Sequence, residues 1–256
     1  MKRAWLAVRA VVLWLLSGIH FFTVTPLLVL LGVFIDPRRN DWPQRFLFRN
    51  VLRIAGVKFE VHRAPGFDPK RTCLFVSNHI NIFDAFVVYS AIPQFLRGLE
   101  LESHFRIPAY GWMMRRFGNI PVYKHPTAAQ TKELYRRTRA ALDDGISLVV
   151  FPEGGRTLDG HMRPFRDGAF RMAIQFGYPI VPMAITGSYE FNRKGSWMIH
   201  PGKIVVYLGE PIETRGLTKN DVPALRDRVH KVVSDKVEAA IAARQTKTSD
   251  PYPARA

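Results

Sequence analysis

A histidine and an aspartate stand five positions apart where a strand-like run gives way to a helix-like one. The strand-like run is TCLFVS (72–77), and the segment from Ser77 to Asp84 reads SNHINIFD. Five positions on a regular helix are about 140° out of phase, so His79 and Asp84 can meet only if His79 precedes the helix. A carboxylate on one imidazole nitrogen fixes the tautomer and stabilises the imidazolium, which leaves the other nitrogen as a general base. The alternative interpretation is that both residues simply cap a helix.

Two further segments carry anion-binding groups at predicted strand ends. The segment GNIPVYK (118–124) ends in the cation Lys124, and FPEGGRT (151–157) contains Glu153, Gly154, Gly155 and Arg156. In an open α/β sheet, ligands collect at strand ends, where glycines admit an anion and arginine binds it as a fork. Taken alone, the second segment is equally compatible with a tight turn that carries a surface ion pair.

Alternating strand-like and helix-like segments beyond residue 50 predict the elements that would position these groups. They indicate an α/β fold, for which we expect a mixed central sheet flanked by helices. Strands are predicted at 57–63, 72–77, 146–151, 178–186 and 203–209, the last edge-like, and helices at 83–91, 128–143, 167–176 and 221–243. The last helix would place Leu225, Val229, Val232, Val237 and Ile241 near one face.

The N-terminal segment predicts membrane residence. No charged residue occurs from Ala10 to Ile35, and this run exceeds the roughly 20 residues that cross a bilayer core. A cleavable signal would have a shorter apolar stretch and a small-residue cleavage site, which the sequence lacks. Because Pro26 lies within the run and basic residues flank both ends, a kinked span and a re-entrant hairpin are both allowed. The hairpin is the preferred interpretation.

Composition restricts the chemistry and the partners. The chain has 37 Lys and Arg against 21 Asp and Glu, a net charge of +16, which favours an anionic partner such as lipid head groups or an acidic carrier protein. A nucleic-acid binder would need a docking module, and none is recognisable. Cys73 is the single cysteine and lies in a strand-like run, so neither a disulfide nor a thiolate nucleophile is expected. The histidines form no metal-binding motif, and no metal is predicted.

The segment FRIPAYGWMMRRF (105–117) mixes large apolar side chains with three arginines. Such a segment could line an acyl channel or rest on a membrane surface. Packing in the core is the competing interpretation, and the two stay open.

Taken together and in order, the motifs resemble the PlsC-type lysophospholipid acyltransferase family. The resemblance covers roughly residues 55 to 210 and rests on Asn78-His79-x4-Asp84, the segment 118–124, the segment 151–157 and Val181-Pro182. It implies a membrane-bound enzyme that moves a fatty acyl group from a thioester of coenzyme A or acyl carrier protein to a lysolipid hydroxyl. It also implies that His79 is the general base, that Asp84 is its partner, and that Glu153 and Arg156 help to bind the acceptor phosphate.

Three positions depart from the family pattern. Asn81 stands where serine is common, Gly155 where threonine is usual, and Lys124 where arginine often closes the second block. Gly155 lacks a hydroxyl, and Lys124 is a point charge instead of a planar fork. Both of these changes fall in blocks that would bind the acceptor head group.

The expected function is therefore transfer of an acyl group to 1-acylglycerol-3-phosphate, which gives phosphatidic acid. Another lysolipid acceptor, such as a lyso-ornithine lipid, and a non-enzymatic membrane-anchored basic scaffold are the alternatives. No cofactor is expected beyond acyl-CoA or acyl carrier protein as co-substrate, and membrane lipids are the expected partner. The donor, the acyl chain length and the oligomeric state stay open.

The resemblance also gives an expected organisation. Residues 1–50 would form the membrane anchor with a basic flank, 51–244 the catalytic domain and 245–256 a flexible tail. The active site would lie at the cytoplasmic face of the inner, or plasma, membrane. His79 and Asp84 would be catalytic, and the substrate-binding residues would be Asn78, Lys124, Glu153, Gly154, Gly155 and Arg156.

Overall fold

The centre of the protein is a mixed seven-stranded sheet in a computed structural model that describes residues 2–39 and 41–245. The strand order is β1-β7-β6-β2-β5-β3-β4, and β6 and β7 are the antiparallel neighbours. Five adjacent strands therefore share one direction, and β1 and β7 run opposite to them. The strands are β1 (Val57–Arg63), β2 (Leu74–Ser77), β3 (Leu96–Leu101), β4 (Ile120–Val122), β5 (Ser147–Val150), β6 (Ile180–Thr186) and β7 (Gly202–Leu208). The α/β prediction is confirmed.

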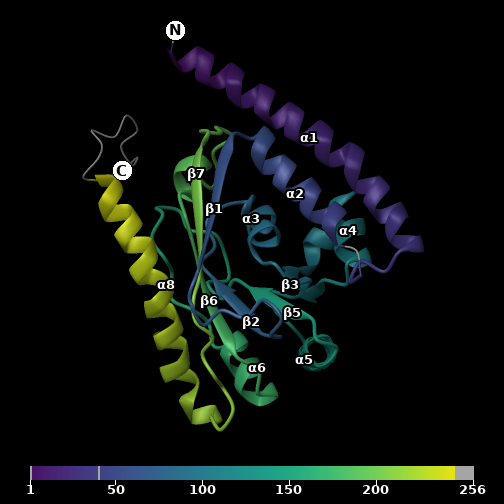
Figure 1. Ribbon diagram of the computed structural model, residues 1–256, viewed down its shortest axis with the longest axis vertical. Coiled ribbons are helices and arrows are strands. Elements are labelled where there is room, and N and C mark those ends of the chain that lie inside the picture. Colours follow the sequence, from purple (N-terminus) through teal and green to yellow (C-terminus); the bar gives the residue numbers. More distant parts are fainter. Residues whose placement is uncertain (1, 40, 246–256) are drawn as a thin grey trace.

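Helices cover both faces of the sheet (Figure 1). The central strands β2 and β6 are buried throughout, as expected for parallel strands with helices on both sides. Alternate residues of β2 enter different cores, because Phe75 faces one side whereas Leu74 and Val76 face the other. The helices are α1 (Lys2–Phe34), α2 (Trp42–Ile54), α3 (Asp84–Ala91), α4 (Tyr110–Arg116), α5 (Ala128–Asp143), α6 (Gly168–Phe176), α7 (Ser188–Phe191) and α8 (Val222–Gln245), with short 3-10 turns η1 (Glu102–Arg106) and η2 (Lys219–Asp221).

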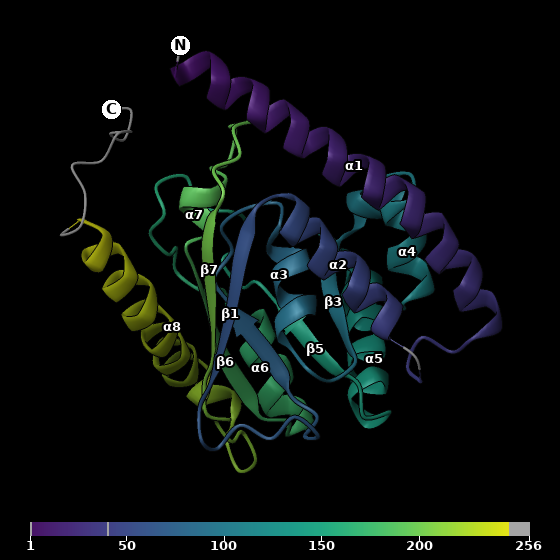
Figure 2. The ribbon, with the colours of Figure 1, turned by 45° about the horizontal axis from the view of Figure 1, so that its top comes forward.

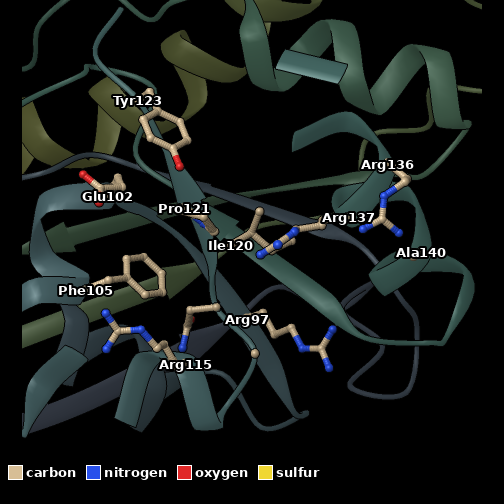
Figure 3. A pocket seen from close by; sticks show the side chains of 12 residues that line it. Arg97, Glu102, Phe105, Arg115, Ile120, Pro121, Tyr123, Arg136, Arg137 and Ala140 are labelled. Carbon is tan, nitrogen blue, oxygen red and sulfur yellow. The ribbon is translucent and has the colours of Figure 1, made fainter. Parts of the chain in front are cut away.

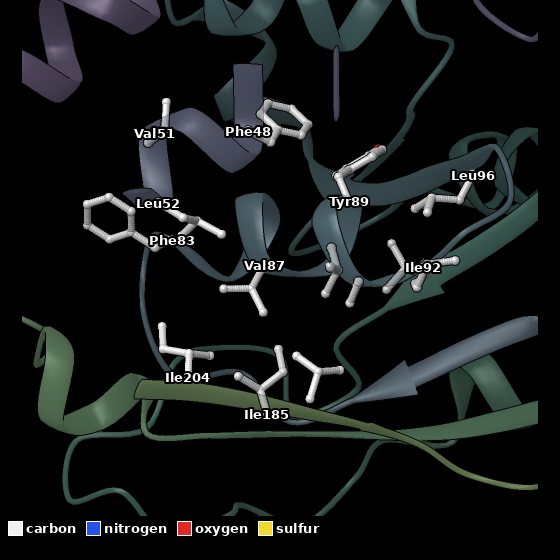
Figure 4. Packing of buried hydrophobic residues seen from close by; sticks show 14 of the residues in the cluster. Phe48, Val51, Leu52, Phe83, Val87, Tyr89, Ile92, Leu96, Ile185 and Ile204 are labelled. Carbon is white, nitrogen blue, oxygen red and sulfur yellow. The ribbon is translucent and has the colours of Figure 1, made fainter. Parts of the chain in front are cut away.

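The first core lies between the sheet and helices α1 to α4. Figure 4 shows how Phe48 of α2 and Val87 of α3 pack over the sheet residues Ile185 and Ile204. The second core lies beneath α5, α6 and α8. Two cores on opposite faces fix β2, and they fix with it the turn that follows this strand.

Helix α1 is continuous through Pro26, so the re-entrant hairpin predicted for the apolar run is wrong. The reason is packing on both sides of the proline, since Phe21 and Leu28 are both buried against the domain. The chain reverses later, in the turn after α1, and α2 returns beside α1 (Figures 1 and 2). In the described part of the chain, α1 is the one helix long and apolar enough to cross a membrane.

Helix α2 was not predicted, although it positions the helix that carries Asp84. Its Arg45 is held by Asp41 at 2.7 Å and donates to the main-chain carbonyls of Tyr89, Ile92 and Gln94 at the end of α3. A cation at the C-terminus of a helix satisfies carbonyls that lack partners within the helix. Arg45 therefore fixes the far end of α3.

Most predicted elements occur within two residues of their predicted limits, with two corrections. Strand β7 is not an edge, because β1 pairs beside it from a distant part of the sequence. In α8, Val232 is exposed and Val233 is buried instead, so the predicted face was out of phase. The expected domain boundary at residue 50 falls inside α2. The tail was predicted for residues 245–256. Gln245 ends α8, and residues 246–256 lie outside the described residues.

Candidate active site

His79 lies on the turn between β2 and α3, and its ring contacts Asp84, the first residue of α3. The distance between His79 Nδ1 and Asp84 Oδ2 is 2.7 Å. The Asp84 side chain is fully buried, whereas that of His79 is 26% exposed. Nδ1 is therefore occupied by the carboxylate, and among the described residues Nε2 has no hydrogen-bond partner. This arrangement is the one that a general base requires.

Asp84 is a buried carboxylate with a complete set of donors. Its Oδ2 accepts hydrogen bonds from the main-chain nitrogens of Ile80 at 2.6 Å and Asn81 at 3.0 Å. Its Oδ1 accepts from Ser188 Oγ at 3.1 Å. These bonds offset the cost of burying a charge and fix the carboxylate against the histidine ring.

Ser188 and Asn81 form a brace behind Asp84. The Asn81 amide nitrogen donates to Ser188 Oγ at 2.8 Å and to the Ser188 carbonyl at 2.6 Å, and its amide oxygen accepts from Phe83 N at 2.7 Å. Asn81 therefore joins the β2–α3 turn to the start of α7. Sequence reasoning missed Ser188, although its place just after the end of β6 was an available signal.

Glu153 holds the main chain of the site. Its Oε1 accepts from His79 N at 2.7 Å and its Oε2 accepts from Arg163 N at 2.9 Å. Burial raises the pKa of this carboxyl above its ordinary value, and the two main-chain donors oppose that rise. Because both oxygens are used and the side chain is enclosed, Glu153 positions the histidine loop. The expected role of Glu153 in binding the acceptor phosphate stays a prediction.

Asn78 is also a structural residue. Its amide nitrogen donates to the Ile185 carbonyl at 2.9 Å, and its amide oxygen accepts from Ile185 N at 2.8 Å. Asn78 is buried, and these bonds tie the end of β2 to β6. The expectation that it also binds substrate stays a prediction.

One face of the His79 ring is covered by Phe151. The ring centroids are 4.4 Å apart and the planes differ by 23°. Phe151 directly follows β5, so the strand next to β2 supplies a rigid wall for the base. The stack and the Asp84 contact together restrict the ring orientation.

The cations expected to bind an anion gather near His104 at the carboxyl ends of β3, β4 and β5. A hydrogen bond to Glu100 raises the pKa of His104, and the charges of Arg156 and Lys124 lower it. Lys124 is exposed and Arg156 is half-buried. The sheet therefore brings together two cations that are far apart in the sequence.

The glycines of the 151–157 segment make room for two arginines that sequence reasoning missed. Gly154 has a φ of +70°, and a β-carbon there would lie 2.5 Å from Cζ of Arg166. A β-carbon on Gly155 would lie 3.3 Å from Nη1 of Arg163. Glycine at 154 is thus required by both the left-handed backbone and the close guanidinium.

Burial shows which residues of the 105–117 segment lie in the core and where Cys73 lies. Met113, Met114 and Phe117 of the 105–117 segment are buried in the core, whereas Ile107 and Trp112 are exposed. The segment therefore contributes both to the core and to the surface. Cys73 is buried, and burial raises its pKa to about 12, which keeps the thiol protonated at neutral pH.

Comparison with known proteins identifies the family. The family model described as Acyltransferase matches residues 58–186. The 1-acyl-sn-glycerol-3-phosphate acyltransferase of Limnanthes douglasii is 30% identical over 182 residues, which cover 71% of this chain and 64% of that protein. The human 1-acyl-sn-glycerol-3-phosphate acyltransferase alpha is 29% identical, over 72% of this chain and 65% of its own length. The match thus spans slightly less than two thirds of these relatives.

Two bacterial proteins match nearly the whole chain. The 1-acyl-sn-glycerol-3-phosphate acyltransferase of Pseudomonas aeruginosa is 25% identical over 96% of both chains. The crystal structure of the 1-acyl-sn-glycerophosphate acyltransferase PlsC from Thermotoga maritima has a TM-score of 0.75 and 22% identity, and the match covers 93% of this chain and 97% of that one. The second match shows a shared fold. Since the family model covers more than half of the sequence and includes both His79 and Asp84, the chain belongs to the acyltransferase family.

Proposed function

We propose that the protein transfers a fatty acyl group from a thioester to the free hydroxyl of 1-acylglycerol-3-phosphate, which yields phosphatidic acid. The observation that carries this proposal is the contact between a fully buried Asp84 and the partly exposed ring of His79. The names of several relatives describe the same activity.

The proposed reaction uses His79 as a general base. Nε2 takes the proton of the lysolipid hydroxyl while its oxygen attacks the thioester carbonyl, and Asp84 stabilises the imidazolium that forms. The carbon–sulfur bond then breaks, and the departing thiolate receives the proton from His79. An ester and a free thiol result, and the histidine returns to its neutral form. No covalent acyl-enzyme is needed, because acceptor and thioester react directly.

The acceptor phosphate is proposed to lie beside Arg156 and Lys124. Arg156 offers two parallel donors, and Lys124 adds a second charge. A neutral head group would leave both cations without compensation in a site from which the lipid displaces water. This argument favours a phosphate-bearing acceptor over a lyso-aminolipid.

The proposed location is the membrane surface, with the site at the cytoplasmic face of the inner, or plasma, membrane, where thioester donors occur. Support comes from α1, whose outer side exposes large apolar residues along its length, among them Leu15, Ile19, Phe22, Leu27, Leu30 and Val33. Hydrophobic burial of these side chains is insensitive to salt, whereas contact through surface charge is screened. The protein should therefore stay with membranes in a high-salt or carbonate wash.

The test is a substrate panel. Purified full-length protein is incubated in mixed micelles with lysophosphatidic acid, other lysophospholipids or lyso-ornithine lipid, and with acyl-CoA or acyl carrier protein thioesters. Products are identified by mass spectrometry, with H79A as the inactive control. We expect phosphatidic acid to be the preferred product. Preference for a phosphate-free acceptor would replace the proposed substrate, and absence of any product would favour a non-enzymatic scaffold.

A further inference from the structure

A cleft of about 510 Å³ flanks the edge strand β4. Figure 3 shows its lining, with the rings of Phe105 and Tyr123 on one side and the side chains of Arg136 and Arg137 on the other. Arg97 of β3 and Arg115 of α4 complete the set of arginines. The cleft runs from Gly118, before β4, to Tyr123, which follows it. Three separate elements, β3, α4 and α5, therefore direct guanidinium groups to one hollow.

The cleft carries more positive charge than its surroundings offset. Arg136 and Arg137 share a single carboxylate, that of Glu133. The one acidic residue in the lining, Glu102, is paired with Arg106. The lining therefore has four arginines. Glu133 is shared by two of them, and Glu102 is already paired with Arg106, which lies outside the lining. A polyanion would supply the missing compensation.

Arg97 and Arg115 give the strongest indication that the cleft binds an anion. The Nε atom of Arg97 is buried and has no hydrogen-bond partner among the described residues, which costs free energy unless a ligand accepts the bond. Burial lowers the pKa of Arg97, the positive charge of Arg38 lowers it further, and Asp144 and Asp36 act in the opposite direction. In the described part of the chain, the exposed side chain of Arg115 has no ion-pair partner.

The shape and chemistry of the cleft suit a nucleotide. Its volume falls within the range of small-molecule sites, roughly 300–1,000 Å³, and a hollow of this kind fits a small molecule better than the convex surface of an acidic protein. Phe105, Ile120, Pro121 and Tyr123 supply an apolar and aromatic surface for a flat base. Guanidinium groups bind phosphate as bidentate forks.

We propose that this cleft binds the phosphorylated adenosine end of a coenzyme A thioester, and this inference rests on the proposed acyl transfer. The arginines would hold the phosphates, and the aromatic surface would hold the base. Strand β4 is the third strand from β2 across the sheet, which corresponds to about 14 Å at the usual strand spacing. The pantetheine arm is roughly as long as four extended residues, about 14 Å. A donor whose thioester end leaves the cleft at Tyr123, beyond the carboxyl end of β4, would therefore span this lateral distance toward His79.

The binding test uses full-length protein in detergent micelles and adenosine 3′,5′-bisphosphate as the probe. The variant R115Q/R136Q removes one charge from each of two walls. Both side chains are exposed, so the fold should be retained. The matched control is R139Q, because Arg139 lies on the same helix α5, is exposed and pairs with Asp143 outside the cleft. By calorimetry, we expect the double variant to bind the probe at least about tenfold more weakly, whereas R139Q and H79A should bind like the unaltered protein.

Kinetics then connect the cleft with the donor. The double variant should raise the KM for acyl-CoA at least about tenfold and leave kcat and the acceptor KM nearly unchanged. Equal binding of the bisphosphate by the double variant and R139Q would overturn the proposal. The proposal would also be overturned if R115Q/R136Q lost activity with an acyl carrier protein donor but kept it with acyl-CoA, since an acidic protein would then be the ligand of the cleft. Probe binding through the cleft without acyl transfer to any lysolipid would refute the proposed function and still support a nucleotide site.

Discussion

The anionic and cationic parts of the site are built in opposite ways. Asp84 and Glu153 are buried, and every carboxylate oxygen accepts a hydrogen bond from the protein. Lys124 and Arg156 lie on loops, and within the described residues neither side chain has a hydrogen bond or an ion pair. The geometry of the proposed base is therefore fixed before any substrate arrives, whereas the final position of the cations would depend on the anion that they are proposed to bind. Substitutions in the buried part should therefore lower kcat, whereas substitutions of the cations should raise a KM.

The largest effect is expected from His79→Ala. Removal of the base should lower kcat by roughly 10²–10⁴-fold, and the melting temperature should change little because the ring is partly exposed. Steady-state kinetics on purified protein measure the first effect, and calorimetry measures the second. His62→Ala, an exposed histidine on the edge strand β1, is the control. Unaltered turnover in His79→Ala would end the proposed mechanism.

The second effect tests whether the brace behind Asp84 matters. Ser188→Ala removes the donor to Asp84 Oδ1 and an acceptor for Asn81. A buried carboxylate that loses one hydrogen bond should cost about 1–3 kcal/mol of unfolding free energy, and kcat should fall while both KM values stay nearly constant. Ser90→Ala is a matched control, because Ser90 is also buried, lies on α3, and has a hydroxyl without a hydrogen-bond partner in the part of the chain that the structure describes. Similar losses in both variants would mean that Ser188 only fills space.

The third effect should be confined to binding. Arg156→Ala should raise the acceptor KM about tenfold or more without lowering the melting temperature, and Arg156→Lys should recover part of the loss because it keeps the charge without the fork. Kinetics with each substrate varied in turn provide the measurement, and Arg171→Ala on α6 is the control. A rise in the donor KM alone would assign Arg156 to the thioester. It would then also contradict the proposed phosphate contact.

The smallest effect is expected at Cys73. Since burial raises its pKa from an ordinary value of 9.0 to about 12, the thiol should resist alkylation at pH 8 until the protein unfolds. In the unfolded chain the same thiol loses its proton near its ordinary pKa, so its contribution to stability should fall as the pH rises from about 9 toward 12. Cys73→Ala should keep full activity. Rapid alkylation of the folded protein, followed by mass spectrometry, would contradict the buried placement.

Sequence reasoning succeeded where one local pattern determines the outcome. The apolar run before the histidine predicted β2, and the spacing of His79 and Asp84 required a turn before α3, which the structure has. It failed where distant segments decide. The brace at Ser188 depends on the pairing of β6 with β2, and the structural use of Asn78 depends on the same pair. Nothing local distinguishes these polar residues from ligand-binding ones.

The same limit explains the errors in the fold. Strand β7 alternates like an edge strand, and it becomes internal only because β1 joins it from the other end of the sequence. The run around Pro26 looks breakable by itself, and contacts of Phe21 and Leu28 with the domain keep it helical. The segment 92–117 contains the short elements β3, η1 and α4. Their sequences are too short to show a clear periodicity, so the elements they pack against determine their structure. Pairing and packing partners thus decided each of these cases.

The parallel pairing of β1 with β7 has a consequence for biosynthesis. Strand β1 leaves the ribosome early, but its partner begins at Gly202, so this edge of the sheet stays open until most of the chain has been made. Helix α1 is complete long before that time and can enter lipid as soon as it emerges. With the proposed membrane location, the nascent chain would reach the membrane before its sheet is finished, and the enzyme would become competent there instead of being delivered from solution.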